Sequence, residues 1–387
     1  MLQQIWHALQ MSFLMGWEIF WALILGFGLS AIIQAFVPKG QMSKLLPDSS
    51  LKSLTIACGL GAASSSCSYA AVALTRSLVR KGANFIAAMG FQLASTNLVI
   101  ELSLLLIVLL GWQFAASEFL GGIILVGLMA VLFRRFVSNQ LIESAEQQAD
   151  RNLLGKMEGH ALMDMSVTDG PLLNRIFSRR GFTAISHYFI MDWAAIWKDI
   201  VVGLLIAGAL GAWVPHDFWT AFFLQNHPVL TEFWGPFIGP FVAIFSFVCS
   251  VGNIPLAAVL WNGGISFGGV ISFIFADLIV LPILHIYWKY YGFKMMLAIF
   301  AIYYVAMVTA ALLIEFIFQL FHLVPHHSHV SIIETTIHFN YTAALNIVFG
   351  IIAVILLLRF LKTGGLHMLS MMENPKMHHN DGDSKKQ

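Results

Sequence analysis

Two stretches of small and polar residues interrupt long apolar runs, and one stretch repeats the other at a fixed offset. A shift of 182 positions places Cys67-Ser68 on Cys249-Ser250. Eight identities follow this shift without a gap between Cys67 and Ala94. A match of this length within one chain indicates an internal duplication.

Each break leaves backbone groups without helical partners at a depth where lipid cannot bond to them. The breaks must therefore face protein or a water-filled cavity, and paired breaks in two halves of a chain are typical of a transporter's binding site. We predict that a small-molecule substrate contacts the residues at both breaks. The predicted binding residues are Ser64, Ser65, Ser66, Cys67, Ser68, Cys249, Ser250 and Asn253.

The composition predicts an integral membrane protein. Of 387 residues, 58% are hydrophobic and 11% are charged, whereas about a quarter of the residues in a soluble domain are charged. A formal net charge of +1 gives no reason to expect nucleic acid as a partner. The expected partners are membrane lipid and the substrate, and assembly into a homo-oligomer is left open.

Seven apolar runs are long enough, at about 20 residues, to cross a bilayer. One of them, Phe119–Phe133, is short, and a start nearer Trp112 is an alternative. The predicted spans are Met11–Val37, Ala83–Leu110, Phe119–Phe133, Trp193–Val214, Ile265–Tyr287, Met295–Leu320 and Tyr341–Leu361.

The runs that carry the breaks, Ser53–Val79 and Trp234–Trp261, are predicted to be re-entrant hairpins. Lys and Arg flank the first run on both sides, and neither residue flanks the second. Because short cytoplasmic loops are enriched in Lys and Arg, the two runs enter from opposite faces. An arm of about 11 residues reaches roughly the 15 Å half-thickness of the hydrocarbon core.

The predicted fold is an all-α polytopic membrane protein, an inverted repeat of about seven spans plus two re-entrant hairpins. Nine kinked spans are the alternative. The N-terminus is expected outside the cell and the C-terminus in the cytoplasm. The predicted divisions are a first membrane repeat at 1–133, a cytoplasmic linker at 134–190, a second inverted repeat at 191–320, an external loop with an extra span at 321–361, and a cytoplasmic tail at 362–387.

Carboxyl groups inside predicted spans are candidates for function, because charge is costly there. Asp277 lies in mid-span and aligns with Ser95 of the first copy. Asn97 and Glu101 are four residues apart, which predicts that they share one face of a continuous helix. We predict that Asp277, Glu101 and Asn97 carry proton coupling, and the alternative for each is a structural hydrogen bond. Glu315, nearer a span end, is predicted to reach the membrane surface.

The thiols of Cys67 and Cys249 occupy equivalent positions at the two breaks. In a pocket of small residues they suit a soft, thiophilic species such as trivalent arsenic. The alternative is that both residues serve only packing, since cysteine is often buried. A closed zinc site takes four ligands, and no His lies near either Cys in the sequence. No metal or other cofactor is therefore predicted.

Several of these motifs resemble a bacterial predicted-permease family that includes organoarsenical efflux permeases. The resemblance covers roughly Leu51–Leu110 and Phe241–Ile286 and implies export of small thiophilic or organometalloid compounds. Family members often carry Cys-Ser-Cys followed by Gly and Pro at the first break, whereas this chain has one Cys there and no Pro. The motifs are Ser66-Cys67-Ser68, Leu78-Val79-Arg80-Lys81-Gly82-Ala83, Ala94-Ser95-Thr96-Asn97, and Val248 to Leu256 followed by Gly263-Gly264.

The leading interpretation is a secondary-active permease of the inner membrane, a proton-coupled exporter rather than an enzyme. The chain contains no P-loop for a self-contained ATPase. A passive channel for a small solute is an alternative. An enzyme that uses Cys67 as nucleophile would need a base within reach, and the nearest histidines, His160 and His187, lie in or beside the predicted linker.

Overall fold

In a computed structural model, the described residues form helices joined by short connections, without a β-strand among them. The structure describes residues 2–36, 45–64, 68–149, 167, 178–224, 227–245, 250–325 and 341–366. The helices are α1 (Leu2–Phe36), α2 (Leu51–Ser64), α3 (Ser68–Arg80), α4 (Phe85–Asn97), α5 (Ile100–Leu109), α6 (Trp112–Phe136), α7 (Asn139–Ala149), α10 (Arg179–Trp213), α11 (His216–Phe222), α12 (Pro228–Ile244), α13 (Ser250–Asn262), α14 (Phe267–Phe275), the 3₁₀ helix η2 (Ala276–Ile279), α15 (Leu281–Tyr291), α16 (Phe293–Leu320) and α17 (Tyr341–Lys362).

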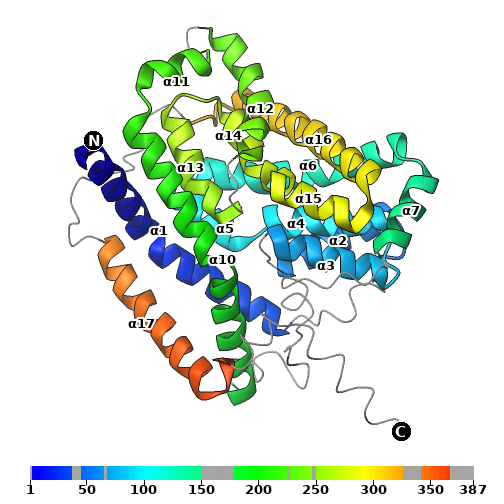
Figure 1. Ribbon diagram of the computed structural model, residues 1–387, viewed down its shortest axis with the longest axis horizontal. Coiled ribbons are helices and arrows are strands. Elements are labelled where there is room, and N and C mark those ends of the chain that lie inside the picture. The colour runs from blue at the N-terminus through cyan, green and yellow to red at the C-terminus, as the bar shows by residue number, and fades with distance from the viewer. Residues whose placement is uncertain are drawn as a thin grey trace.

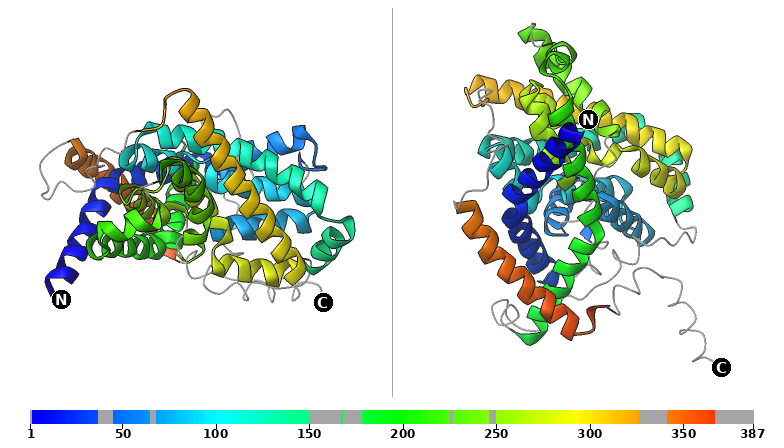
Figure 2. Two further views of the ribbon diagram at one scale, coloured as in Figure 1. Left: turned by 90° about the horizontal axis from the view of Figure 1, so that it is seen from above. Right: turned by 60° about the vertical axis from the view of Figure 1, so that its left-hand side comes forward.

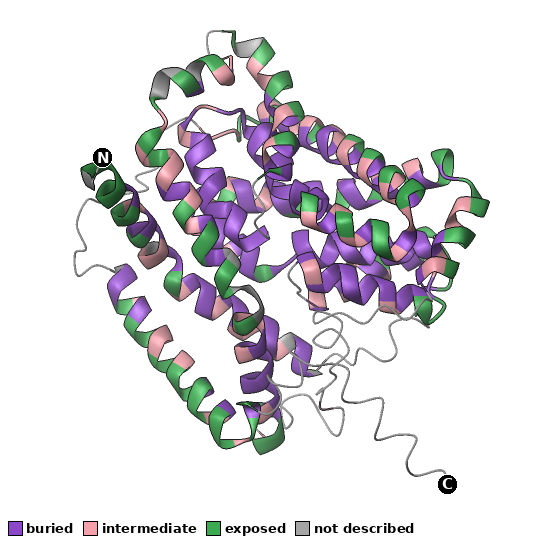
Figure 3. Ribbon diagram, in the orientation of Figure 1, coloured by how far each residue is buried: buried purple, intermediate pink, exposed green. Residues whose placement is uncertain are grey.

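The long helices α1 and α10 lie side by side, and α17 runs along their outer side (Figures 1 and 2). The remaining helices pack into one bundle beside this pair. Its interior is formed largely by α3 to α5, α13 and α14, whose residues are mostly buried, whereas α17 exposes most of its apolar surface (Figure 3). An exposed face of this kind suits a helix in contact with lipid.

Among the described residues, four helices are long and apolar enough to cross a membrane, and the number rises to six if each of two bent pairs is one span. This confirms a polytopic α-helical membrane protein. The short predicted span at 119–133 belongs to α6, which begins at Trp112. The alternative prediction, a start of this span nearer Trp112, is therefore correct. The segment predicted as a linker, 134–190, contains α7 and the first turns of α10.

Both duplicated segments have the same local structure. α3 and α13 have bounds exactly 182 positions apart, and each ends in a Schellman motif. Gly82 and Gly264 occupy the left-handed position of this motif, both with φ of +86°, a conformation in which Gly avoids the steric cost of a Cβ. The next helix is then capped by Asn84 in one copy and Ser266 in the other.

A second interruption in each copy lies within a segment predicted to be one span. Leu98 and Val99 leave the helical conformation between α4 and α5. At the equivalent place Val280 is extended, with φ −65° and ψ 149°, and the chain bends there by 42°. Pro282 follows in the first turn of α15, where its ring is accommodated because the first helical N–H groups need no partner within the helix.

Candidate functional site

The carboxyl group of Asp277 joins the two duplicated segments. Asp277 lies in η2 and is 0% exposed. Ser68, the first residue of α3, donates a hydrogen bond from Oγ to its Oδ2 at 2.6 Å. Ser250, the first residue of α13, places a second hydroxyl group near the same carboxyl group. The residues that follow the two breaks therefore meet at one acid.

The two helix starts give this position a favourable field for negative charge. α3 begins at Ser68 and α13 at Ser250, the two residues whose hydroxyl groups lie at Asp277, and neither helix has an acidic residue in its first turn. The N-terminus of a helix carries a partial positive charge. Within the part of the chain that the structure describes, Oδ1 of Asp277 has no hydrogen-bond partner. One oxygen of the carboxyl group thus remains available for a proton or a ligand.

A chain of polar side chains follows beside Asp277. Gln92 of α4 donates from Nε2 to the Tyr287 hydroxyl at 2.6 Å, and the Tyr303 hydroxyl lies 3.4 Å from Gln92 Oε1. All three residues are fully buried, and both tyrosines lie within electrostatic range of Asp277. This group connects α4, α15 and α16 next to the acid.

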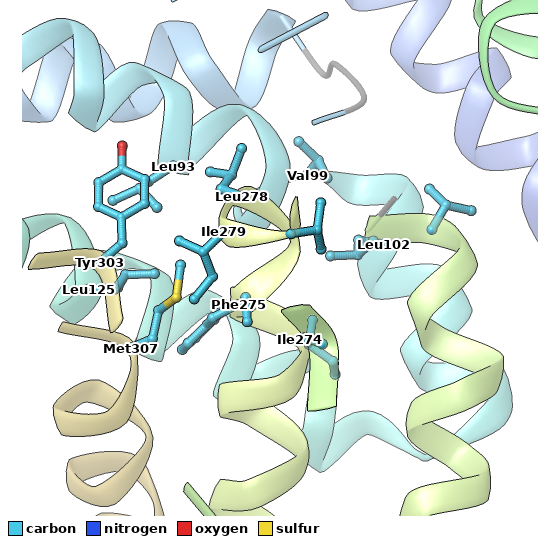
Figure 4. Close-up of a cluster of buried hydrophobic side chains, with 14 of the residues drawn as sticks. Leu93, Val99, Leu102, Leu125, Ile274, Phe275, Leu278, Ile279, Tyr303 and Met307 are labelled. Carbon is cyan, nitrogen blue, oxygen red and sulfur yellow. The ribbon is translucent and has the colours of Figure 1, made fainter. Parts of the chain in front are cut away.

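Apolar side chains fill the space between the two interrupted helices. In Figure 4, Val99 and Leu102 from the α5 region and Leu278 and Ile279 from η2 gather in one cluster, and all four are buried. Close packing of this kind excludes water from a protein interior. These apolar side chains therefore enclose the polar groups at Asp277.

Several predicted binding residues have defined positions. Ser68 and Ser250 meet at Asp277, as described above. Ser64, the last residue of α2, donates to the Gly61 carbonyl at 3.0 Å, and Asn253 is fully buried in the first turn of α13. Four predicted binding residues lie outside the described residues, namely Ser65, Ser66, Cys67 and Cys249.

The prediction that Asn97 and Glu101 share one face of a continuous helix is wrong. α4 ends at Asn97 and α5 begins at Ile100, because Leu98 and Val99 are not helical. Asn97 donates from Nδ2 to the Leu93 carbonyl at 3.0 Å within its own helix. Glu101 lies in the first turn of α5 and is 6% exposed. The two side chains therefore belong to different helices.

Glu315 has a partner at the start of another helix. It is buried within the protein, and its Oε2 accepts a hydrogen bond from the Gly268 N–H at 3.2 Å. Gly268 lies in the first turn of α14, where N–H groups have no partner within the helix. Glu315 thus caps a helix start inside the bundle.

Sequence reasoning missed the buried carboxyl group of Glu118. This residue lies in the second turn of α6 and is 0% exposed. The prediction began a span at Phe119 and so left Glu118 outside it. The apolar residues at 114–116 continue the run on the other side of Glu118, and this was the signal that the acid lies within the helix.

A bundle of interrupted helices with polar residues at the interruptions is the architecture of a membrane transport protein. Comparisons with known proteins agree with this class. Residues 4–316 match the model of a family described as predicted permease. A Mycobacterium tuberculosis protein named "Putative permease Rv2963" is 56% identical over 337 residues, which are 87% of this chain and 83% of that protein.

The chain therefore belongs to the predicted-permease family. The family inferred from the motifs at the breaks is thus confirmed. No solved structure matches the chain.

Proposed function

We propose that the chain is a secondary-active permease that exports a small thiophilic or organometalloid compound, such as a trivalent organoarsenical, in exchange for protons. One observation carries this proposal: Ser68 donates a hydrogen bond to the buried Asp277, and the hydroxyl group of Ser250, from a separate segment of the chain, lies near the same carboxyl group. A buried carboxyl group at paired helix interruptions combines a protonatable residue with a substrate-binding position.

The proposed topology is an inverted repeat in which both interrupted runs are re-entrant. The Asn84 N–H donates to the Leu46 carbonyl at 2.8 Å. Leu46 precedes α2 and Asn84 follows α3, so the two ends of the first run lie together. This geometry supports a hairpin that enters and leaves at one face. We place that face in the cytoplasm of an inner membrane, with the N-terminus outside and the C-terminus inside, because basic residues flank the run.

Protonation of Asp277 would change how the two segments hold together. An ionised carboxylate accepts charge-assisted hydrogen bonds, which are about twice as strong as neutral ones. A proton on Asp277 therefore weakens its attraction for the hydroxyl groups of Ser68 and Ser250. This change links proton binding to how the first residues of α3 and α13 are held at Asp277, and movement of these helices would open the site to one face or the other.

The sequence next to Ser68 and Ser250 supports a soft substrate. Cys67 directly precedes Ser68 in the chain, and Cys249 directly precedes Ser250. Thiolate ligands favour soft metals and metalloids.

The experiment uses purified protein in liposomes with a trivalent organoarsenical as the probe. In the Asp277→Asn variant, uphill transport driven by a pH gradient should be lost, because the amide cannot release a proton. Exchange of labelled for unlabelled substrate at equal pH should persist, since Asn can still accept from both hydroxyl groups. Uphill transport equal to that of the wild type would refute the role of Asp277. Absence of exchange stimulation by substrate on the opposite side would indicate a channel instead.

A further inference from the structure

Glu118 is a fully buried acid whose carboxyl group has no hydrogen-bond partner. Among the described residues, neither Oε1 nor Oε2 finds a donor, and the side chain is 0% exposed. By contrast, Asp277 accepts a hydrogen bond from Ser68, and Glu315 accepts one from Gly268. A bare carboxylate in such surroundings costs several kcal/mol or more, so Glu118 is suited to hold a proton.

Aromatic contacts show how deep Glu118 lies relative to Asp277. The rings of Phe114, near the start of α6, and Phe267, the first residue of α14, have centroids 4.9 Å apart. The two helices therefore begin at the same level. Glu118 follows Phe114 by four residues and Asp277 follows Phe267 by ten. Since both helices rise about 1.5 Å per residue, Glu118 is the shallower acid.

The helices that carry the two acids pack closely between them. A Cβ at Gly121 would lie 2.8 Å from Cζ of Phe275, so α6 and α14 approach closely at this depth. The charge of Asp277 disfavours ionisation of Glu118. On the shallow side, Phe114 also contacts Trp261, with ring centroids 5.1 Å apart, and these buried rings cover the approach to Glu118.

Asp277 is the titratable group whose charge acts on Glu118. The helices packed against α6 are α2, α4, α5, α14 and α16, and η2 continues α14. The other titratable side chains on these helices are Lys52 and Cys58 on α2, Glu101 on α5, and Lys294, Tyr303, Tyr304 and Glu315 on α16.

We propose that Glu118 is a second proton-binding residue, through which protons pass between Asp277 and the membrane face where α6 and α14 begin. Two neighbouring carboxyl groups resist simultaneous ionisation, so a proton leaving one is favoured to stay on the other. The transfer step rests on the proposed proton-coupled transport. Proton binding by Glu118 does not depend on that proposal.

The first measurement is infrared difference spectroscopy of the full-length protein in lipid nanodiscs during a pH titration, which needs no substrate. Wild-type protein should show a carbonyl band from a protonated buried carboxyl group that Glu118→Gln removes and Glu118→Asp retains at a shifted frequency. Ser117→Ala is the control, because Ser117 is equally buried on the same helix and bonds only to the Phe114 carbonyl. An unchanged spectrum in Glu118→Gln would overturn the proposal.

The second measurement is transport in liposomes with a trivalent organoarsenical. Glu118→Gln should slow transport driven by a pH gradient by about tenfold or more, a typical loss for a proton-transfer group, and leave exchange at equal pH within about twofold. Loss of the infrared band with unchanged driven transport would overturn the transfer role. If wild-type protein transports nothing, the proposed function fails, whereas the infrared result still decides whether Glu118 binds a proton.

Discussion

Asp277 is present in only one of the two duplicated segments. Its counterpart, Ser95, donates from Oγ to the Gln92 carbonyl within its own helix at 2.9 Å. The carboxyl group of Asp277 therefore comes from the second copy alone and accepts a hydrogen bond from Ser68 of the first copy. In the proposed mechanism, one copy rather than both supplies the proton-binding carboxyl group where the copies meet.

The two cysteines predicted to bind substrate provide a test of substrate class. We expect Cys67→Ser and Cys249→Ser each to weaken binding of a trivalent organoarsenical, because a hydroxyl oxygen is a poorer ligand for a soft centre. Loss of one good ligand contact should cost at least about 1.4 kcal/mol, or tenfold in the dissociation constant. Isothermal titration calorimetry on purified protein measures this change.

Cys58→Ser is the matched control for both substitutions. Cys58 lies within α2, away from the break, and is a free, partly buried cysteine. Its replacement should leave the dissociation constant unchanged. Equal affinities for all three variants and the wild type would mean that the thiols of Cys67 and Cys249 serve packing, and that substrate binding belongs to other groups.

Polar residues inside the apolar runs that were recognised as spans or hairpins could be predicted from the sequence, whereas a misplaced span end or a contact between distant positions hid others. Ser68, Ser250 and Asp277 are polar within apolar runs, and all three were predicted as site residues. Glu118 was missed because the apolar run was taken to start after it. The contact between Ser68 and Asp277 was also missed, since it joins positions 209 apart and depends on tertiary packing.

Helix interruptions could also be predicted where the residue types at the break stand out, and not where they do not. The break between α2 and α3 was predicted because serines and a cysteine interrupt an apolar run. The break at Leu98 and Val99 was not predicted, because both residues are apolar and no Pro or Gly follows them. At the equivalent position, Pro282 was an available signal, since the residue before a proline disfavours the helical conformation.

Close packing of α2 against α4 can be tested with two glycines of the same helix. A Cβ at Gly61 would lie 2.6 Å from the Phe91 carbonyl oxygen and 2.9 Å from the Ser95 nitrogen. Since backbone atoms cannot rotate away, Gly61→Ala should lower the free energy of unfolding by about 1–3 kcal/mol. At Gly59 nothing lies within 4 Å of a Cβ.

Gly59→Ala is therefore the control, and it should be neutral or stabilising by about 0.5–1 kcal/mol because Ala favours a helix. Unfolding of the purified protein in mixed micelles, followed by circular dichroism, measures both changes. Equal stability of the two variants would contradict the close contact between α2 and α4 at Gly61.

The hairpin geometry predicts which residues are accessible from each face. In a variant whose native cysteines are replaced, Lys52→Cys and Lys81→Cys should both react with an impermeant maleimide from the cytoplasm, as should the marker Asn139→Cys after α6. His227→Cys and Asn262→Cys, which flank the second run, should react from outside. Reaction of Lys52→Cys and Lys81→Cys from opposite faces would rule out the first hairpin and the inverted repeat.

At the scale of the whole molecule, the helices of the predicted first membrane repeat are interleaved with those of the predicted second repeat. α1 packs against α10, α6 packs against α16, α3 contacts α15 and α13 contacts α5, and the first of these pairs is visible in Figure 1. Each pair joins a helix of the first repeat to a helix of the second. Movement at Asp277 therefore cannot be confined to one segment, because α3 and α13 each pack on a helix of the opposite one.

α17 lies outside this interleaved core and outside the matched family region. Its Asn346 side chain inserts into the backbone of α1. Oδ1 accepts from the Trp21 N–H at 2.9 Å, and Nδ2 donates to the Trp17 carbonyl at 2.8 Å. In a regular helix these two backbone groups would bond to each other. The inserted amide accounts for the 43° bend of α1 at this point.

Replacement of Asn346 by Leu should straighten α1 and loosen α17. Trp21 N–H can then bond to the Trp17 carbonyl, whereas α17 loses two hydrogen bonds worth about 1 kcal/mol each. Spin labels at the exposed positions Gln10 and Ile355 should give a longer and broader distance distribution by double electron–electron resonance than in the parent protein. Ile347→Ala, an exposed neighbour on α17, should leave the distribution unchanged. A parent-like distribution in Asn346→Leu would mean that packing of α1 against α10, rather than the inserted amide, sets the bend.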